Sequence, residues 1–236
     1  MKKRLFGILL LIILLGGLTG CSFKKEEVKK NADALKFKQE YESFNNTKNE
    51  YFDYRSLSID EENPFVYSTD AEIVKKIEEK ESFIVYFGDS ECPWCRSVIE
   101  QAIKVAKENN IEKIYYVKFW NGFHKEVIRD VYELDEKNKP VLTEKASTAY
   151  TKLLEYLDSV LKDYTLTDKK GNVINVGEKR IFLPNFVAIE NGVAKELVTG
   201  KSEKQTHYNG ELTDEIINDE KNTFNDFFNK YKSLSK

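Results

Sequence analysis

The chain has 236 residues, of which 41% are hydrophobic, 13% aromatic and 33% charged, with 4 Pro, 11 Gly and 3 Cys. These fractions are close to those of ordinary globular proteins, so they exclude a wholly disordered chain, a collagen-like repeat and a small disulfide-dense scaffold. The net charge of −3 gives no basic surface for nucleic acid, and we expect one folded domain with tails.

Residues 1–20 have the pattern of an export signal. The basic residues Lys2–Arg4 precede an apolar run, Leu5–Leu15, which ends before Gly16 and Gly17. A helix that spans a bilayer needs about 20 apolar residues, so this run is too short. The segment is therefore predicted to be a signal peptide.

The signal ends in Leu18-Thr19-Gly20-Cys21, which resembles the lipobox of bacterial lipoproteins. The resemblance implies that Cys21 is lipidated on sulfur and becomes the first residue of the mature chain. Two or more acyl chains, at about 0.8 kcal/mol per buried CH₂, would anchor the protein at the extracytoplasmic face of the bacterial cell membrane. The alternative is a short transmembrane anchor with an incidental cysteine.

Residues 21–50 are rich in Lys, Glu and Asn and show no sustained apolar period, apart from a weak helical pattern over 34–44. We expect a lipidated N-terminus and a charged tether that holds the folded domain, residues 51–236, off the membrane.

After residue 50, strand and helix patterns alternate along the chain. Thr69 and Glu72 form a capping box, which predicts the start of a helix. The run Phe83–Phe87 is typical of a central strand that is buried on both faces. Pro93 suits the first position of a helix. The expected strands are 65–67, 83–87 and 114–118, and the expected helices run from 69 to 80 and from 93 to 109.

Residues 119–180 form an enlarged middle segment, in which helical spacing of apolar residues predicts a helix over 146–162. A polar turn favours a small hairpin over 165–176. Beyond it, Asn191-Gly192 favours the tight turn of a hairpin over 186–198, and Thr213 is expected to cap a final helix.

Cys92 and Cys95 stand at the predicted junction between a strand and a helix, two residues apart. The helix N-terminus offers unpaired N–H groups and a partial positive charge, which favour the thiolate form of Cys92, the species that attacks disulfides. Cys92 is the expected nucleophile, and Cys95, one turn deeper, is expected to resolve the mixed disulfide. Pro93 fixes the helix start, and Trp94 is expected to add an exposed apolar surface.

A zinc site and a structural disulfide are the alternatives for this pair. A zinc site needs four ligands, and only His124 and His207 remain to help. A structural disulfide across one helical turn would close too short a loop to stabilise much. Redox chemistry is therefore favoured, with no metal, nucleotide or flavin cofactor beyond the Cys92–Cys95 pair.

The segment 83–95, which ends in Cys-Pro-Trp-Cys, resembles the strand, loop and active-site helix of the thioredoxin superfamily. Residues 183–192, followed by Thr199-Gly200, are similar to that family's cis-proline strand and hairpin. The resemblance implies a three-layer α/β fold, with a mixed central sheet flanked by helices and an enlarged insertion at about 119–180. It also implies that the Leu183–Pro184 bond is cis and faces the cysteines, so that Pro93, Trp94, Leu183 and Pro184 shape a peptide groove.

One residue departs from the family pattern. Thioredoxins carry a buried Asp six residues before the first cysteine, where it assists proton movement at the second, and this sequence has Tyr86 there. Asp89 and Glu91 are the alternative acids, although nearby carboxylates also disfavour a thiolate. Lys118, which matches a strand-end lysine of many thioredoxins, is expected to be a solvated charge without that acid.

We expect a membrane-anchored thiol–disulfide oxidoreductase that acts on the thiols or disulfides of exported proteins or peptides. Oxidation is the favoured direction because disulfides persist outside the cytoplasm, and an unidentified membrane redox partner would have to regenerate the pair. The alternative is a non-catalytic accessory or peptide-binding thioredoxin-like lipoprotein involved in peptide export.

Overall fold

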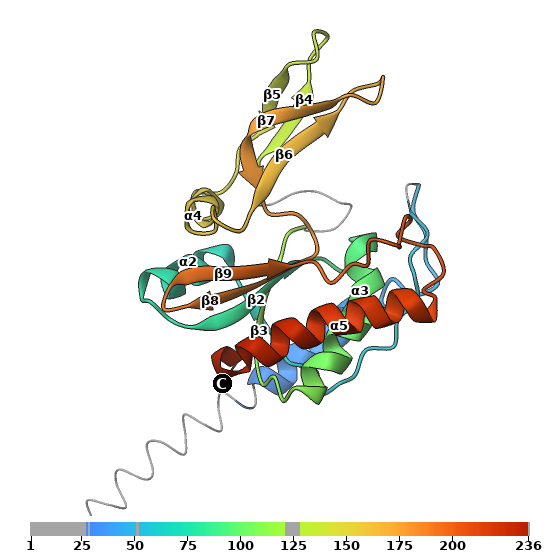
Figure 1. The fold of residues 1–236 in the computed structure, drawn as a ribbon, viewed down its shortest axis with the longest axis vertical. Helices are drawn as coiled ribbons and strands as arrows, with labels where there is room; N and C mark the ends of the chain where they lie inside the picture. Colours follow the sequence, from blue (N-terminus) through green and yellow to red (C-terminus); the bar gives the residue numbers. More distant parts are fainter. Residues whose placement is uncertain (1–26, 28, 51, 121–127, 236) are drawn as a thin grey trace, which may run out of the picture.

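The computed structural model describes residues 27, 29–50, 52–120 and 128–235. The predicted signal peptide, Cys21 and His124 lie outside these residues. Figure 1 shows a central sheet with helices on both sides, and two hairpins that rise away from it. The chain is therefore a mixed α/β protein, as predicted.

The central sheet has five strands in the order β1-β3-β2-β8-β9. Strands β1, β3 and β2 are parallel, whereas β8 runs antiparallel to β2 and β9 antiparallel to β8. The strands are β1 (Phe65–Ser68), β2 (Phe83–Gly88), β3 (Ile114–Lys118), β8 (Asn185–Glu190) and β9 (Val193–Val198). Every residue of β2 is buried, which confirms the predicted central strand.

Alternate residues of β2 point to opposite faces of the sheet, and each face has its own hydrophobic core. Ile84 and Tyr86 belong to the core shared with α3, α5 and the N-terminal helix, while Val85 and Phe87 belong to the core shared with α2 and α4. The helices are α2 (Asp70–Glu78), α3 (Pro93–Glu108), α4 (Thr148–Tyr156) and α5 (Asp214–Tyr231), followed by the short η1 (Lys232–Ser235). The capping box at Thr69 and the cap at Thr213 are both present.

A helix covers residues 29–42, inside the segment that the sequence predicts to be a tether. Its residues Ala34, Phe37 and Tyr41 are buried, and the Phe37 ring stacks on Phe65 at 4.2 Å between centroids. The tether prediction is therefore wrong for this stretch. Its three buried positions lie on one helical face, but they are too few among charged residues to produce a clear period.

The middle insertion contains two hairpins and one helix. The strands are β4 (Val131–Leu134), β5 (Pro140–Glu144), β6 (Lys162–Thr167) and β7 (Val173–Arg180). The β6–β7 hairpin confirms the predicted one, with a longer second strand. The predicted helix over 146–162 is shorter in the structure, because Leu157 caps α4 and Lys162 already pairs with Arg180.

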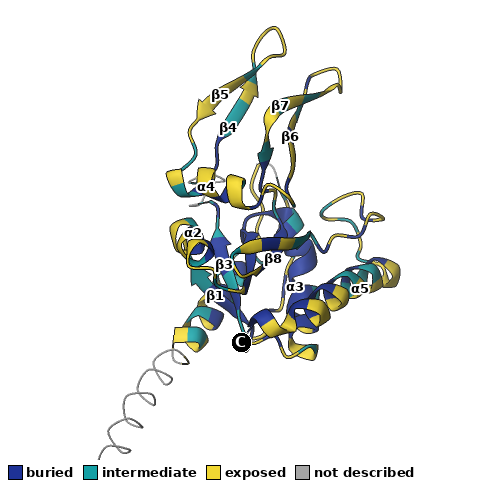
Figure 2. Cartoon of the chain, turned by 60° about the vertical axis from the view of Figure 1, so that its left-hand side comes forward, coloured by how far each residue is buried: buried dark blue, intermediate teal, exposed yellow. Residues whose placement is uncertain are grey.

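The sequence did not predict the β4–β5 hairpin, and most of its residues are exposed (Figure 2). The two hairpins contact each other through Tyr132, whose ring lies edge-on to Tyr164 at 5.8 Å and whose hydroxyl donates to Glu178 at 2.9 Å. Such contacts between hairpins cannot be read from local sequence.

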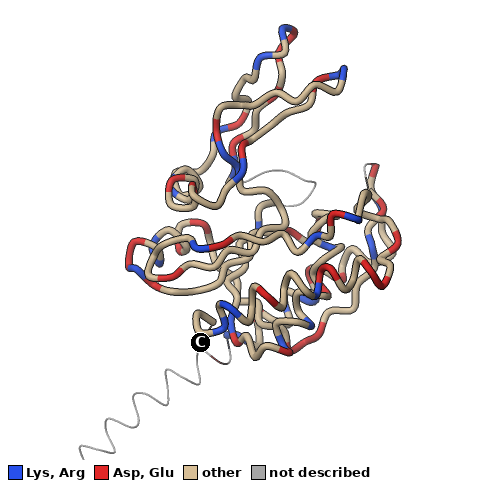
Figure 3. The backbone as a smooth tube through the Cα atoms, in the orientation of Figure 1, with Lys and Arg blue, Asp and Glu red and all other residues tan. Residues whose placement is uncertain are grey.

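Acidic and basic residues are interspersed along α5 and the hairpins, as the coloured backbone shows (Figure 3). Several form exposed pairs, such as Lys230 with Glu196 at 2.6 Å and Lys204 with Glu215 at 2.8 Å. Each exposed pair contributes at most about 1 kcal/mol, so the two hydrophobic cores are the main source of stability. In the part of the chain that the structure describes, no helix combines the length and apolarity that crossing a membrane requires.

Candidate active site

The two cysteines lie where β2 leads into α3. Cys92 is the N-cap residue, and its sulfur accepts a hydrogen bond from the backbone N–H of Cys95 at 3.4 Å. Pro93 occupies the first turn, as predicted. Cys92 is 5% exposed and Cys95 is fully buried, and both are free thiols. Cys92 is therefore the less deeply buried residue of the pair.

The Leu183–Pro184 bond is cis and precedes β8, the strand that pairs with β2. The register that sets Asn185 opposite Phe87 carries Leu183 to the end of the sheet where the cysteines lie. The Cys92 thiol donates to the Leu183 carbonyl oxygen at 3.9 Å. The structure thus brings together Cys92, Cys95 and Leu183, which the sequence singled out from segments ninety residues apart.

Trp94 is half-buried rather than freely exposed, because the connection between β9 and α5 lies against it. The Lys201 ammonium lies 4.2 Å from the centre of the indole ring, and Tyr208 contacts the ring edge-on at 6.1 Å. Tyr208 in turn contacts Phe52 edge-on at 5.4 Å. The sequence gave no local signal for these neighbours of Trp94, since they come from two distant loops.

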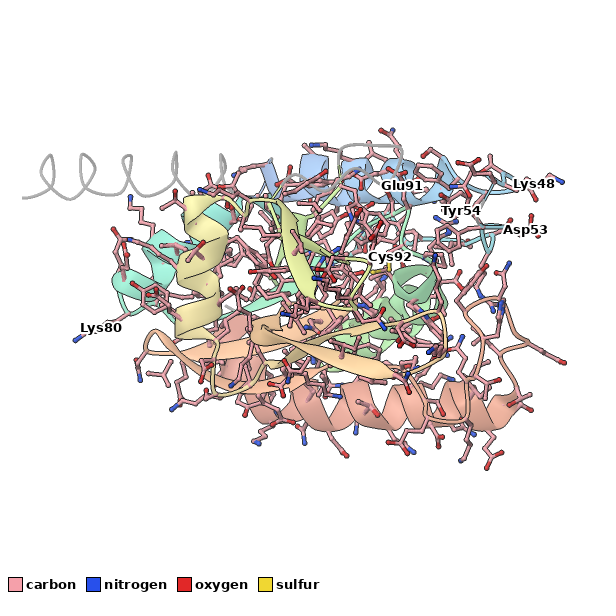
Figure 4. All side chains as sticks on the ribbon, turned by 90° about the horizontal axis from the view of Figure 1, so that it is seen from above. Lys48, Asp53, Tyr54, Lys80, Glu91 and Cys92 are labelled. Atoms are coloured by element: carbon pink, nitrogen blue, oxygen red, sulfur yellow. The ribbon has the colours of Figure 1, made fainter. Side chains whose placement is uncertain are left out.

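Figure 4 labels Tyr54 and Glu91 close to Cys92. Burial and the nearby Glu91 carboxylate raise the pKa of Tyr54 to about 12, so its hydroxyl stays protonated at neutral pH. Glu91 itself is only 4% exposed. The surroundings of Cys92 therefore include a neutral phenol, Tyr54, and an acid, Glu91.

Asp89 is a fully buried acid in the loop before Cys92. Its carboxylate accepts hydrogen bonds from the backbone N–H of Glu91 at 3.0 Å and of Trp120 at 2.8 Å. Burial raises the pKa of Asp89 to about 7, although Lys118 and the two amides oppose this rise. The backbone carbonyl of Asp89 also accepts from Cys92 N at 3.2 Å, which ties this acid to the active-site loop.

Lys118 is not simply solvated, contrary to the prediction. Its ammonium pairs with the Glu40 carboxylate of the N-terminal helix at 3.1 Å. The same carboxylate accepts from the Tyr116 hydroxyl at 3.1 Å. A polar cluster therefore joins the N-terminal helix to the end of β3.

Tyr86 occupies the position where the family pattern has a buried acid. Its ring stacks on Phe186 at 4.4 Å and on Tyr116 at 5.5 Å, and its hydroxyl lies 2.9 Å from the Tyr41 hydroxyl. Gly88 makes room for the ring, since a Cβ at this position would lie 2.1 Å from Cζ of Tyr86. The Tyr86 side chain is therefore closely packed, and its hydroxyl has a hydrogen-bond partner.

Arg96 follows Cys95 in α3 and is fully buried. Its guanidinium donates to the backbone carbonyls of Tyr41 at 2.7 Å, Arg55 at 2.9 Å and Ser90 at 3.1 Å, and to the Asn45 side chain at 3.0 Å. The side chain therefore connects the N-terminal helix, the loop after it and the active-site loop. The sequence missed it because an arginine in a helix is usually exposed.

Comparison with known proteins finds no family model that matches the chain and no curated protein with significant similarity to it. Within the described ranges, no group of three or more His, Cys, Asp or Glu side chains is arranged to hold a metal ion. His207, one of the two histidines, packs on Tyr208 at 4.2 Å between ring centroids. The geometry around Cys92 is therefore the main evidence on function.

Proposed function

We propose that the protein is a thioredoxin-like thiol–disulfide oxidoreductase with Cys92 as nucleophile and Cys95 as resolving residue. The proposal rests on the contacts of the Cys92 sulfur. Cys92 caps a helix, accepts from the N–H of Cys95 and lies 3.9 Å from the carbonyl of Leu183. The sheet order, with an antiparallel hairpin beside β2, and the cis Leu183–Pro184 bond also fit a thioredoxin-like fold.

The chemistry needs only the two sulfurs. In the oxidising direction, a substrate thiolate attacks Cys92 in a Cys92–Cys95 disulfide, so that a mixed disulfide forms and Cys95 leaves with the electron pair and gains a proton. A second substrate thiolate then attacks the substrate sulfur and releases Cys92. Two electrons pass to the pair, and a membrane electron acceptor would have to remove them.

Substrate would bind as an extended peptide beside Leu183 and Pro184. Proline has no N–H to donate, and the Leu183 carbonyl lies next to the reactive sulfur, where a peptide N–H could pair with it. Trp94 and its neighbour Tyr208 supply aromatic surface at the same end of α3. We propose exported proteins or peptides as substrates.

The reduction potential tests this proposal. We expect the protein, equilibrated with glutathione or dithiothreitol buffers, to show one reversible two-electron transition of Cys92 and Cys95. A value near roughly −120 mV identifies a disulfide donor, which we favour, and a value near roughly −270 mV identifies a reductase. A pair that shows no reversible transition with either buffer contradicts the proposal.

We also propose that lipid on Cys21 anchors the protein at the extracytoplasmic face of the membrane. This rests on the lipobox-like Leu18-Thr19-Gly20-Cys21 and the apolar run before it. Cys21→Ser is expected to release the protein from the membrane fraction after cell lysis. Retention of this variant in that fraction would argue for a transmembrane anchor instead.

A non-catalytic accessory role in peptide export is the second candidate. The observation that favours it is the burial of both sulfurs, since only 5% of Cys92 is exposed. Such a protein would bind peptides beside Trp94 and Leu183 without exchanging disulfides. The cysteine variants argued in the Discussion separate the two functions.

A further inference from the structure

An exposed cation lies beside the first turn of α3. Lys201 follows β9, and its ammonium lies 4.2 Å from the centre of the Trp94 ring. Trp94 is two residues after Cys92, and its ring packs against the hydrophobic cluster that includes Cys92. Among the residues that the structure describes, no carboxylate forms an ion pair with Lys201, whereas the nearby Lys204 pairs with two acids of α5. The charge of Lys201 is therefore available to a bound molecule.

The backbone around Lys201 is held against α5. Gly200 has a φ angle of +73°, and a Cβ at this position would lie 2.0 Å from Cζ of the Phe224 ring, so the chain passes close to that ring. Ser202 is buried, and its hydroxyl donates to the Asp219 carboxylate at 2.8 Å. Both neighbours of Lys201 are therefore anchored to α5, which fixes the point from which the lysine side chain extends.

The position of a substrate relative to Lys201 follows from the Cys92 sulfur. In the proposed function the substrate cysteine is bonded to this sulfur, which lies 3.9 Å from the Leu183 carbonyl oxygen. An α-helix rises about 1.5 Å per residue, so Trp94 begins only about 3 Å along the helix axis from Cys92. Residues on either side of the substrate cysteine are about 3.8 Å from it along their own chain. A side chain at one of these positions can therefore reach the surface that Trp94 and Lys201 form.

The other charged residues next to Cys92 in the chain do not attract an anion at this surface. Asp89 and Glu91 precede it, and both are buried acids. Arg96 is a cation, but it is fully buried, and its guanidinium donates to backbone carbonyls and to a side-chain amide. Lys201 differs from all three, because it is exposed and its ammonium lies over an aromatic ring at the start of α3.

We propose that Lys201 is a specificity-determining residue of the exchange reaction, which favours substrates with a carboxylate next to the reacting cysteine. This deepens the proposed disulfide exchange and rests on it. The substrate carboxylate pairs with the Lys201 ammonium while the Trp94 ring holds the ammonium from its other side. A mixed disulfide with Cys92 forms in both directions of exchange, so the same preference applies to oxidation and to reduction. The substrate class is therefore exported peptide segments with an acidic residue beside a cysteine.

Two activated peptides test this preference. They are identical except that Asp or Asn occupies both positions next to their single cysteine, whose sulfur carries a thiopyridyl group in a disulfide. The Cys92 thiolate attacks the peptide sulfur and forms the mixed disulfide, and the thiopyridyl group leaves with the electron pair, gains a proton and is measured by its absorbance. The full chain is used in its reduced form with Cys21→Ser, so that Cys92 and Cys95 are the only thiols. The result is the ratio of the rate with the Asp peptide to the rate with the Asn peptide.

Lys201→Met keeps a side chain of similar shape over Trp94 and removes the charge. We expect it to lower the ratio about threefold at low salt, as loss of an exposed ion pair would. Lys201→Glu should lower the ratio about tenfold, because repulsion replaces attraction, and Lys201→Arg should keep it. The difference between the parental protein and Lys201→Met should shrink as salt is added, because exposed charges are screened over about 10 Å at about 0.1 M.

Lys80→Met is the matched control, because it removes the same charge from an exposed lysine at the opposite end of the molecule (Figure 4). It should keep the parental ratio. The proposal is overturned if Lys201→Met keeps the parental ratio, which includes equal slowing with both peptides. It is also overturned if Lys80→Met lowers the ratio to the same extent, because net charge would then explain the result. Failure of the proposed function looks different, since the parental protein itself would then release no thiopyridyl group from either peptide.

Discussion

Cys92→Ser is expected to abolish disulfide exchange, whereas Cys95→Ser should retain the first attack and stop at the mixed disulfide. Serine cannot form the thiolate on which the exchange depends, and Cys92 is the residue of the pair that keeps some exposure, 5% against 0% for Cys95. Cys95 is fully buried and can reach only a partner already bonded to Cys92. The two variants should therefore fail at different steps.

The measurement is the capture of mixed disulfides between the protein and exported polypeptides, detected on non-reducing gels and by mass spectrometry. Cys95→Ser should accumulate them, and Cys92→Ser should form none. Ser97→Ala is the control, because it removes a side-chain hydroxyl from the same helix and leaves both cysteines and Cys21 in place. Full biological activity of Cys92→Ser would contradict the redox function and support the accessory role.

The local sequence predicted the parts of the site that depend on neighbouring residues. The run Phe83–Phe87 has no polar interruption, which only a strand buried on both faces explains, and Pro93 after Cys92 fits a helix start. The Asn191-Gly192 turn defined the hairpin beside the site, and both residues have positive φ angles. The cis bond at Leu183–Pro184 came from the family resemblance alone, because composition does not distinguish a cis proline from a trans one.

The rest of the site depends on contacts between distant segments. Arg96 reads as an ordinary surface residue of an amphipathic helix, yet its guanidinium is buried against carbonyls that come from residues 41, 55 and 90. The hydroxyl that bonds to Tyr86 belongs to Tyr41, which lies on a helix in which half of the residues are charged. Asp89 is next to the predicted site, but one of its hydrogen-bond donors is the backbone N–H of Trp120, which follows β3. No local pattern specifies such pairings.

A chain that begins at residue 46 is expected to lose its cooperative unfolding transition. It would lack Phe37 and Tyr41, which are fully buried, and Arg96 would lose its partners at Tyr41 and Asn45. Removal of one large buried aromatic side chain costs about 3–5 kcal/mol, and this chain would lose two of them. The sum is comparable to the roughly 5–15 kcal/mol that stabilises a whole domain.

Circular dichroism during heating tests this, with a chain that begins at residue 27 as the matched control. That control keeps the helix over 29–42 and should unfold cooperatively. Within the full chain, Phe37→Ala should lower the free energy of unfolding by about 3–5 kcal/mol, whereas Leu35→Ala, at a position that is 42% exposed on the same helix, should change it by less than about 0.5 kcal/mol. If the chain from residue 46 melts as the control does, the N-terminal helix is dispensable for the fold.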